Sequence, residues 1–411
     1  MDVFKASFGV ALLFVLSACG NAKSTESVYK KSASPYCAQT RIQSKYIVEW
    51  EDDRFTTEFA ESEEDFKENF LKPKLDEIRS AEPDYVAAFN QPVRTSNLQQ
   101  TFADSQSWGQ EIIEASAAWS RGYSGQNVIV GVVDSFVDTT HPQLKGNILI
   151  NDREIPGNGI DDDGNGYVDD VAGYSFISQP GTNPSTNPHG THVSGIIAAD
   201  PSYGRVKGVA PQAKIVPAPF ISNDGQGSLG DAILAMQYVA SRGAKIINAS
   251  WGGAPCVGAL GSAFAKLSAQ GILLIVAAGN SGIDIDQYPV YPASFLIPNQ
   301  ITVAASTSLD FLASWSNNGY QGTHLAAPGA QILSTVPGNS YGYMDGTSMS
   351  APFVAGAAAV LWSARPEASA AQIRQALVRS VDISAGHEFR VASRGRLNIR
   401  KALEELQRIL P

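Results

Sequence analysis

Apolar runs and amphipathic stretches alternate along most of the chain. The apolar runs are rich in β-branched residues, and they cover residues 128–133, 214–217, 245–248, 272–277 and 301–304. Helical stretches lie between several of them, over residues 190–199, 229–241 and 262–270. Nearly continuous apolar strands are typical of a parallel sheet whose two faces are both covered by helices. We therefore predict a doubly wound α/β domain over residues 108–411, with its ligand-binding residues at the carboxyl ends of the strands.

A smaller unit is expected in front of this domain. Residues 45–50 are predicted to form a short strand, and residues 86–93 a closing strand. Between them, residues 61–80 carry apolar side chains at helical spacing, namely Phe66, Phe70, Leu71, Leu75 and Ile78. The pattern predicts a small α+β domain over residues 45–93 with a modest core.

Two polar segments flank the small domain. Residues 20–44 are rich in Ser, Lys and Thr, and we expect them to act as a tether. Residues 94–107 are also polar, and we expect them to link the two domains.

Composition and charge separate the same two units. Of the 411 residues, 44% are hydrophobic and 17% are charged, which suits about two to three folded units. Acidic residues outnumber basic ones 40 to 30, and the excess lies between Tyr46 and Gln91, which hold 14 acidic and 5 basic residues. The other 365 residues are almost neutral. This balance argues against a nucleic-acid-binding protein, which usually presents a basic surface.

The first 19 residues have the pattern of an export signal. Lys5 precedes an apolar run over residues 8–16, which is too short to span a bilayer. The run ends in Leu16-Ser17-Ala18-Cys19, which resembles the lipobox of bacterial lipoproteins, where the cysteine carries the lipid. We expect Cys19 to be lipidated and the protein to be exported to a bacterial cell envelope. An ordinary cleaved signal is the alternative.

Two cysteines remain after the signal, Cys37 and Cys256. In an exported protein they either form one disulfide or stay unpaired, and the sequence leaves both alternatives open. A bond between them would join the tether to the large domain.

Three reactive residues occur where the predicted sheet would bring them together. Asp134 ends the first apolar run, His189 opens the first helical stretch, and Ser348 opens a long apolar helix that continues to about residue 363. A serine hydroxyl becomes an effective nucleophile when a histidine takes its proton and a buried carboxylate orients that histidine. The three residues therefore indicate nucleophilic catalysis.

A fourth residue, Asn280, follows the apolar run that ends at residue 277. Its side-chain amide and the backbone N–H of Ser348 are both placed to donate hydrogen bonds to a developing oxyanion. Pro352 lies near the start of the helix that Ser348 opens. We expect this proline to fall within the first turn, where the helix tolerates it.

These segments resemble the subtilisin-like serine proteases, the subtilases, whose catalytic residues follow the chain order Asp, His, Ser. The resemblance covers residues 108–411 and rests on six motifs: His-Gly-Thr-His-Val-Ser-Gly at 189–195, Gly-Val-Ala-Pro at 208–211, Asn-Ala-Ser-Trp-Gly at 248–252, Ala-Ala-Gly-Asn at 277–280, Ala-Ala-Pro-Gly at 326–329 and Gly-Thr-Ser-Met-Ser-Ala-Pro at 346–352. It implies a serine endopeptidase acting on proteins or peptides, without an organic cofactor. Ser348 would be the nucleophile and His189 the general base, with Asp134 as its orienting partner and Asn280 as the oxyanion donor.

The resemblance also implies a channel for the substrate. Two segments are expected to flank a bound peptide and pair with its backbone as added strands. The residues concerned are Gly225 and Gly227 on one side and Ser250, Trp251 and Gly252 on the other.

Phe136 departs from the family pattern. The family usually has Thr-Gly or Ser-Gly after the aspartate, whereas this chain has Ser135-Phe136. We expect the phenylalanine to alter a neighbouring substrate subsite and to leave activity in place.

The acidic domain at 45–93 resembles, more loosely, the inhibitory propeptide of this family. Such a segment templates folding, blocks the channel with its C-terminal stretch and is then cut off. We therefore expect a zymogen that processes itself within residues 94–107. If Cys19 carries a lipid, this cut would also release the catalytic domain from the membrane, unless a Cys37–Cys256 disulfide holds the parts together.

The segment 161–170 resembles the start of a calcium loop. It places oxygen ligands at alternate positions, with a glycine at the sixth. The glutamate that such loops carry at the twelfth position is absent, because Ala172 is there. Five aspartates within ten residues would repel one another without a cation, which favours a calcium ion. Its expected ligands are Asp161, Asp163, Asn165, the carbonyl of Tyr167 and Asp169.

Three other interpretations are weaker. His189 and His192 lack the spacing and the third ligand of a zinc site. The order Ser348, Asp382, His387 suits an esterase, but the second glycine of the esterase motif is absent. A non-catalytic, lipid-anchored binding protein on the same fold is the alternative function. The presence of all four catalytic positions favours the enzyme.

Overall fold

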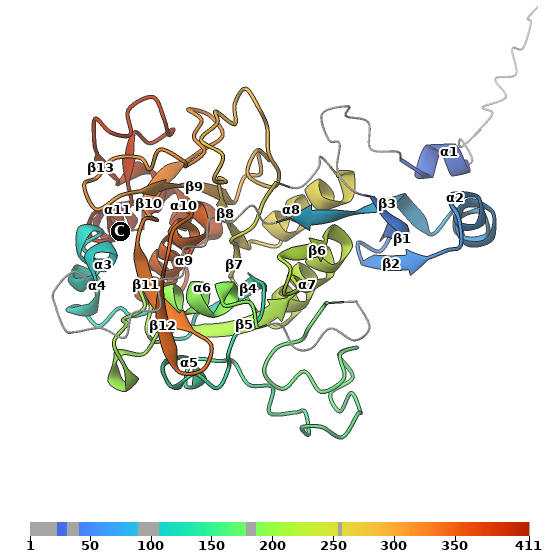
Figure 1. Ribbon diagram of the computed structural model, residues 1–411, viewed down its shortest axis with the longest axis horizontal. Helices are drawn as coiled ribbons and strands as arrows, with labels where there is room; N and C mark the ends of the chain where they lie inside the picture. Colours follow the sequence, from blue (N-terminus) through green and yellow to red (C-terminus); the bar gives the residue numbers. More distant parts are fainter. Residues whose placement is uncertain (1–22, 31–40, 89–106, 178–185, 254–256, 411) are drawn as a thin grey trace, which may run out of the picture.

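The computed structural model describes residues 23–30, 41–88, 107–177, 186–253 and 257–410. The export signal with Cys19, the other two cysteines and almost all of the 94–107 linker lie outside the described residues. Figure 1 shows a large part, which carries most of the helices and strands, and a smaller blue part at one end.

The large part is built on an eight-stranded sheet with the order β13-β14-β10-β9-β8-β7-β4-β5. The pairs from β5 to β14 are parallel, and only β13 at the edge runs antiparallel to its neighbour. The strands are β4 Ile129–Asp134, β5 Lys214–Pro219, β7 Ile246–Ala249, β8 Leu273–Ala277, β9 Gln300–Ser306, β10 Leu325–Pro328, β13 Asp382–Ile383 and β14 Gly395–Arg396. The prediction of a doubly wound parallel sheet is confirmed.

Helices cover both faces of this sheet. The helices α7 (Leu229–Ser241) and α8 (Gly258–Ala269) pack on one face, and α6 (His189–Ala198), α9 (Thr347–Ala364), α10 (Ala370–Arg379) and α11 (Ile399–Ile409) lie on the other. Within β8, Ile275 belongs to the core cluster around α9, whereas Leu274 and Val276 belong to the cluster around α7 and α8. Both faces of the strand are therefore buried, which explains its continuous apolar run.

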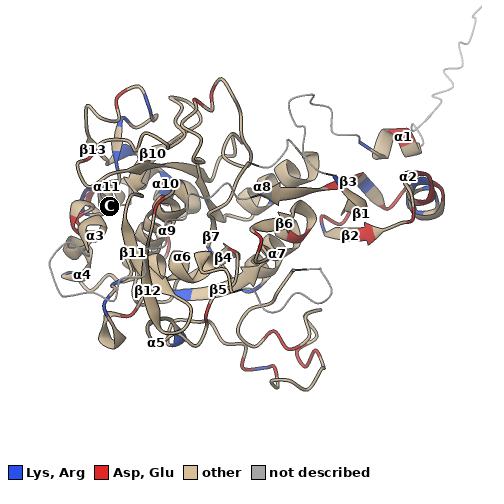
Figure 2. Cartoon of the chain, viewed as in Figure 1, with Lys and Arg blue, Asp and Glu red and all other residues tan. Residues whose placement is uncertain are grey.

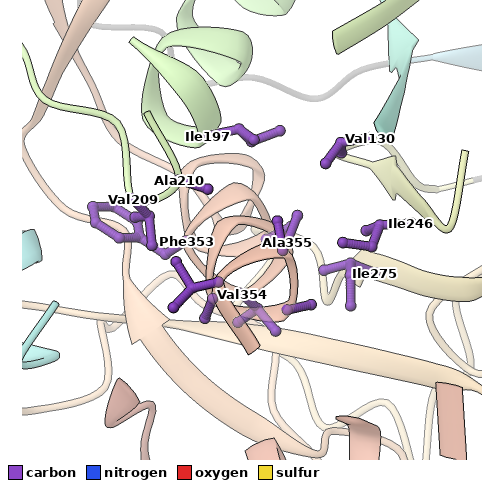
Figure 3. Packing of buried hydrophobic residues seen from close by; sticks show 14 of the residues in the cluster. Val130, Ile197, Val209, Ala210, Ile246, Ile275, Phe353, Val354 and Ala355 are labelled. Carbon is purple, nitrogen blue, oxygen red and sulfur yellow. The ribbon is translucent and has the colours of Figure 1, made fainter. Parts of the chain in front are cut away.

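The helix α9 is the centre of the core. Figure 3 shows Phe353, Val354 and Ala355 of α9 surrounded by apolar side chains from other elements, among them Val130 of β4 and Ile275 of β8. Within the described residues, α9 is the helix long and apolar enough to cross a bilayer, but 89% of it is buried inside the protein. Its hydrophobicity is that of a core helix.

The smaller part is a sheet packed on irregular helical turns. Its own strands are β1 (Arg41–Trp50), β2 (Phe55–Phe59) and β3 (Ile78–Ala88). The helix α2 (Glu63–Asp65) continues as a π-helical turn over Phe66–Leu71 and a 3₁₀ turn over Lys72–Lys74. Its core includes a stack in which the rings of Tyr46 and Phe66 lie 3.9 Å apart.

The helix predicted over residues 61–80 is wrong at its C-terminal end. Helical structure stops at Lys74, and Ile78 is the first residue of β3. Pro73 cannot donate a backbone hydrogen bond and ends the helical run. The apolar side chain of Ile78 is buried, but in a strand. The sequence pattern also missed β2, and the hairpin β11 (Ile332–Val336) with β12 (Ser340–Met344) in the large part.

Part of the expected tether is folded. Residues Thr25–Val28 form a helical turn, α1, and Tyr29 bridges to Ala81 of β3. Val28 and Tyr29 are buried at 2% and 6% exposure in the core of the smaller part. The interpretation of residues 20–44 as a tether is therefore wrong for this docked segment, which apolar contacts hold. It is also wrong for the start of β1, where Arg41 pairs with Tyr85 of β3 and forms an ion pair with Glu63.

The two parts share one sheet. The strand β6 (Gln226–Ser228) of the large part pairs antiparallel with β3, which gives the order β2-β1-β3-β6. Figure 1 shows β3 reaching from the smaller part to a position beside β6 and the helices α7 and α8. The smaller part thus ends as an added strand on the large one.

Candidate active site

Asp134 is the last residue of β4 and is fully buried. The strand β4 pairs with β7 on one side and with the edge strand β5 on the other, and these pairings hold its backbone in place. The Oδ1 atom of Asp134 lies 2.7 Å from Nδ1 of His189 and also accepts a hydrogen bond from the backbone N–H of Ser135. The carboxylate is therefore fixed against one ring nitrogen of the histidine.

His189 is the first residue of α6 and is 4% exposed. The next residue, Gly190, lies against the chain just after Asp134, since a Cβ at Gly190 would lie 2.4 Å from the carbonyl oxygen of Ser135. The backbone N–H of Gly190 donates to Ser135 Oγ. This close approach brings the start of α6 to the end of β4 and allows the Asp134–His189 contact.

Ser348 is the second residue of α9 and is 2% exposed. Its Oγ donates to the carbonyl oxygen of Ser250 at 2.9 Å. The helices α6 and α9 pack against each other, and both begin at the carboxyl edge of the sheet. Asp134 ends β4, whereas His189 and Ser348 lie in the first turns of α6 and α9, which pack against each other.

Pro352 does not lie in the first turn of its helix, contrary to the expectation. The helix α9 begins at Thr347, so Pro352 is its sixth residue. A proline there leaves the carbonyl of the residue four positions earlier, Ser348, without its helical donor. The Oγ of Ser250 donates to that carbonyl instead, at 2.9 Å. Ser250 and Ser348 therefore hold each other by two hydrogen bonds.

Asn280 follows β8 at the same edge and is half-buried. Its Oδ1 accepts from the backbone N–H of Thr347 at 2.9 Å and from Thr347 Oγ1 at 3.0 Å. Because Oδ1 accepts both of these hydrogen bonds, the side-chain amide of Asn280 is oriented by Thr347. Sequence reasoning found Asn280 but missed Thr347, whose role depends on a contact between distant segments.

His192 packs inside α6 and is fully buried. Its Nε2 lies 3.0 Å from the carbonyl oxygens of Ile332 and Gly342, which belong to the hairpin β11–β12. Burial lowers the pKa of this ring to about 3, so the imidazole is neutral. This position agrees with the interpretation of His192 as a packed residue.

One of the two predicted channel segments pairs with the strand that the smaller part contributes. Gly227 of β6 pairs with Ala87 of β3, and Gly225 takes a left-handed φ of 77° in the turn before it. On the other segment, β7 ends at Ala249, so the predicted residues after it are not part of a regular strand. Of these residues Ser250, Trp251 and Gly252, the first two are buried.

Carboxylates of the smaller part occupy the N-termini of two helices of the large part. Asp84 accepts from the backbone N–H of Gly230 in α7, and Glu82 from those of Gly258 and Ala259 in α8. Negative charge is favoured at a helix N-terminus. Burial raises the pKa of both carboxyls, although the helix amides oppose this shift.

A buried lysine joins the same interface. Lys45 of β1 is 2% exposed, and its Nζ lies 2.6 Å from Asp231 Oδ1 and 3.4 Å from Asp84 Oδ2. It also donates to Ser228 Oγ at 2.9 Å. The Lys45 ammonium is therefore placed between one carboxylate from each part. The sequence pattern gave no signal for this contact, which joins residues 186 positions apart.

The acidic loop gathers only part of the predicted calcium ligands. Carboxylate oxygens of Asp161 and Asp163 converge, with Glu154 as the third member, within 4.8 Å of one another. Figure 2 shows acidic residues concentrated along this loop, below β5. Glu154 was not identified from the sequence, because this residue lies seven positions before Asp161, where the alternating pattern of oxygen ligands begins. Oxygen donors of this kind suit a hard cation such as calcium.

The other predicted ligands have different partners. Asp169 accepts hydrogen bonds from the backbone N–H groups of Gly157, Asn158 and Gly159. Asn165 Nδ2 donates to Asp170, and its Oδ1 accepts from the N–H of Tyr167. The expectation that Asp169 is a ligand is therefore not met in this arrangement, because its carboxylate organises the preceding turn.

Comparison with families of known proteins matches residues 125–400 to the subtilase family, Peptidase_S8. Subtilisin DY from Bacillus licheniformis is 33% identical over 298 residues, which cover 72% of this chain and 98% of that protein. Subtilisin E from Bacillus subtilis (strain 168) is 34% identical over 315 residues, 76% of this chain and 75% of its own. Subtilisin-like protease 1 from Plasmodium falciparum (isolate 3D7) is 36% identical over 293 residues, which are 66% of this chain but 42% of that longer protein.

Proposed function

Since the chain belongs to the subtilase family and is a serine endopeptidase, we propose that it cleaves protein substrates through Ser348, His189 and Asp134. The observation that carries these assignments is the buried contact of 2.7 Å between Asp134 and His189 at the sheet edge where Ser348 begins α9. Hydrolysis of an unfolded protein by the wild-type chain, compared with Ser348→Ala, tests the proposal.

In the proposed mechanism, Ser348 Oγ attacks the carbonyl carbon of the substrate while Nε2 of His189 takes its proton. The resulting imidazolium is stabilised by Asp134, which accepts from Nδ1–H. His189 then gives the proton to the leaving amine, the C–N bond breaks, and an ester to Ser348 remains. Water, activated by the same histidine, hydrolyses that ester and restores the serine.

The oxyanion of the tetrahedral intermediate is proposed to bind between Asn280 Nδ2 and the backbone N–H of Ser348. Support comes from Thr347, which holds the Oδ1 side of the Asn280 amide. The oxyanion forms only during reaction, so these donors stabilise the transition state more than the bound substrate.

Replacing Asn280 by alanine is expected to lower kcat by about 10²–10³ with little change in KM. Steady-state kinetics on a peptide substrate measure both constants. Thr347→Val serves as a graded control, because it removes one hydrogen bond to Asn280 and leaves the amide in place, so its loss should be smaller. A kcat of Asn280→Ala within threefold of wild type would contradict the assignment.

The N-terminal part, residues 41–88, is proposed to be an inhibitory propeptide. The pairing of β3 with β6 places a strand of the chain along the edge where a substrate would add. The contacts of Glu82, Asp84 and Lys45 with the large part give this strand a specific register. Self-processing within residues 94–107 would then separate the two parts covalently.

We also propose that the precursor carries a lipid anchor on Cys19. Because Lys23 donates to Glu51 and to the carbonyl of Ile78, a lipid on Cys19, four positions earlier in the sequence, would hold the propeptide close to the membrane surface. Processing is expected to move the catalytic domain from the membrane fraction to the soluble fraction, unless the Cys37–Cys256 disulfide keeps the parts together. Fractionation of cells with and without reductant measures this. Complete release of the catalytic domain without reductant would contradict a disulfide between Cys37 and Cys256.

Calcium is proposed to bind Glu154, Asp161 and Asp163. The ion would neutralise their mutual repulsion and stabilise the loop, and at 100 times its Kd it would add about 2.7 kcal/mol to the free energy of unfolding. We expect calcium, and not magnesium, to raise the melting temperature of the Ser348→Ala chain, in which self-digestion is absent. Asp161→Asn should abolish the increase, whereas Asp162→Asn, a neighbour outside the cluster, should retain it. Equal melting temperatures with calcium and with chelator would contradict the site.

A further inference from the structure

A peptide strand already lies along the edge of the channel. Its residues Val86, Ala87 and Ala88 pair with Ser228, Gly227 and Gln226 of β6. A substrate that adds to this edge uses the same backbone donors and acceptors. The position of Ala87 opposite Gly227 therefore shows where one substrate side chain is received.

Ala87 belongs to the face of the strand pair that Phe220 covers, and Phe220 packs against Trp251. Residues directly opposite each other in an antiparallel pair project from the same face. A Cβ at Gly227 would lie 2.7 Å from Cδ2 of Phe220, so Phe220 covers the face that Gly227 and Ala87 share. The ring of Phe220 packs edge-on against Trp251, with centroids 5.2 Å apart and planes at 69°.

Ala87 is buried together with the two rings. Ala87, Phe220 and Trp251 are each 1% exposed and belong to the same buried cluster. Phe220 is also held at its backbone, since its N–H donates to the carbonyl of Asp134. A longer side chain in place of Ala87 would extend into this buried cluster, and a packed interior resists added volume.

We propose that Phe220 and Trp251 close this subsite, so that the substrate residue opposite Gly227 is restricted to alanine or glycine. The inference rests on the proposed peptidase function and adds a selection by size at one position. Trp251 is assigned this role because its buried indole packs edge-on against Phe220. The strand β3 of the chain itself has a small residue, Ala87, at this position.

The test is to digest a mixture of proteome-derived peptides with the self-processed wild-type enzyme and to identify the cut sites by mass spectrometry. N-terminal sequencing of the same preparation counts the residues between its own cut and Ala87, and this count identifies the restricted position. Leucine and phenylalanine should be cleaved there about 10- to 100-fold less than alanine. Equal use of large and small residues at that position would overturn the proposal. A complete absence of cuts would overturn the proposed function with it.

Trp251→Leu should open the subsite and raise the ratio of leucine to alanine at this one position by about tenfold. The readout is a ratio within one preparation, so partial loss of folded enzyme does not change it. Trp119→Leu is the matched control: Trp119 lies on α4 (Ser116–Trp119), where its Nε1 donates to the carbonyl of Val209, and the wild-type ratio should persist. An unchanged ratio in Trp251→Leu would overturn the role of the indole.

The chain itself offers a second test if Trp251→Leu does not fold. Ala87→Leu should slow self-processing of the full-length protein by about tenfold. Val86→Leu is its control, because Val86 projects from the opposite face of the strand and is only half-buried. Equal processing rates for the two variants would contradict the closed subsite.

Discussion

Ser348→Ala is expected to abolish peptide-bond hydrolysis, lowering kcat by about 10⁵–10⁶. Ser348 Oγ is the atom that would form the ester with the substrate, and alanine offers no nucleophile in its place. The buried Asp134–His189 pair and Asn280 remain, so the variant should still bind substrate. Only the residual effect of binding and oxyanion stabilisation should persist.

Self-processing gives the clearest measurement of this loss. Mass spectrometry of the purified wild-type chain should show a cut within residues 94–107, whereas the Ser348→Ala chain should remain intact. Ser350→Ala is the matched control, since Ser350 is a buried serine of the same helix turn, and this variant should process like the wild type. Processing of Ser348→Ala at the wild-type rate would show that another residue, or another protease, makes the cut.

An intact wild-type chain would have a different meaning. If neither chain is cut and neither hydrolyses an unfolded protein, the binding-protein alternative would replace the proposed mechanism. Phe136, which stands where the family usually has glycine, would then be the first residue to replace by glycine. Its carbonyl accepts from Thr191 Oγ1 and lies against Gly190, so it adjoins the start of α6.

The central fold was predictable because its strands and helices carry unambiguous patterns. β8 reads as five apolar residues because alternate side chains enter two different cores. α7 was predicted with the bounds that the structure has, since Ser228 caps its start and apolar residues recur at helical spacing. Parallel order follows from the alternation of strands with helices.

The smaller part was harder to predict because its elements are short and depend on contacts with other segments. β2 has only five residues, and its outer end, Phe59, is 70% exposed, so it lacks the pattern of a buried strand. The docking of Tyr29 depends on a tilted contact between its ring and that of Phe66, and on a backbone bridge to Ala81. Such contacts between distant segments leave no periodic signal in the sequence.

The acidity of the N-terminal part has a structural explanation that composition alone did not supply. Two of its carboxylates, Glu82 and Asp84, lie at the N-termini of α8 and α7, where backbone N–H groups donate hydrogen bonds to them. A third, Glu49, lies 2.9 Å from Lys266 of α8. The charge excess is thus complementary to the surface that it covers.

The residues of the candidate site that belong to sequence motifs could be predicted, whereas the residues that hold them in position could not. Asp134, His189, Ser348 and Asn280 each end a strand or begin a helix, and these junctions are visible in the sequence. Thr347, which orients Asn280, gives no such signal. Thr347 and Asn280 lie far apart in the sequence, so their contact is visible only in the folded structure.

Asp134→Asn is expected to lower kcat/KM by about 10⁴ while leaving the site folded. The carboxylate accepts from His189 Nδ1–H, which leaves Nε2 without a proton and able to take one from Ser348. An asparagine amide can donate to Nδ1 instead and then favours the other tautomer, in which Nε2 already carries the proton. The nucleophile therefore loses its base, although every heavy atom stays close to its place.

Two measurements separate this loss of tautomer from a loss of structure. Nitrogen NMR of His189 in the Ser348→Ala background should show the proton moving from Nδ1 to Nε2 when Asp134→Asn is added, with a similar melting temperature. Asp138→Asn is the matched control. Asp138 is also buried and accepts from the N–H of Thr140 and Gly338, but not from His189, so kcat/KM should stay within about tenfold of wild type. A kcat/KM for Asp134→Asn in that same range would mean that His189 is oriented by another group, and the assignment of Asp134 would be wrong.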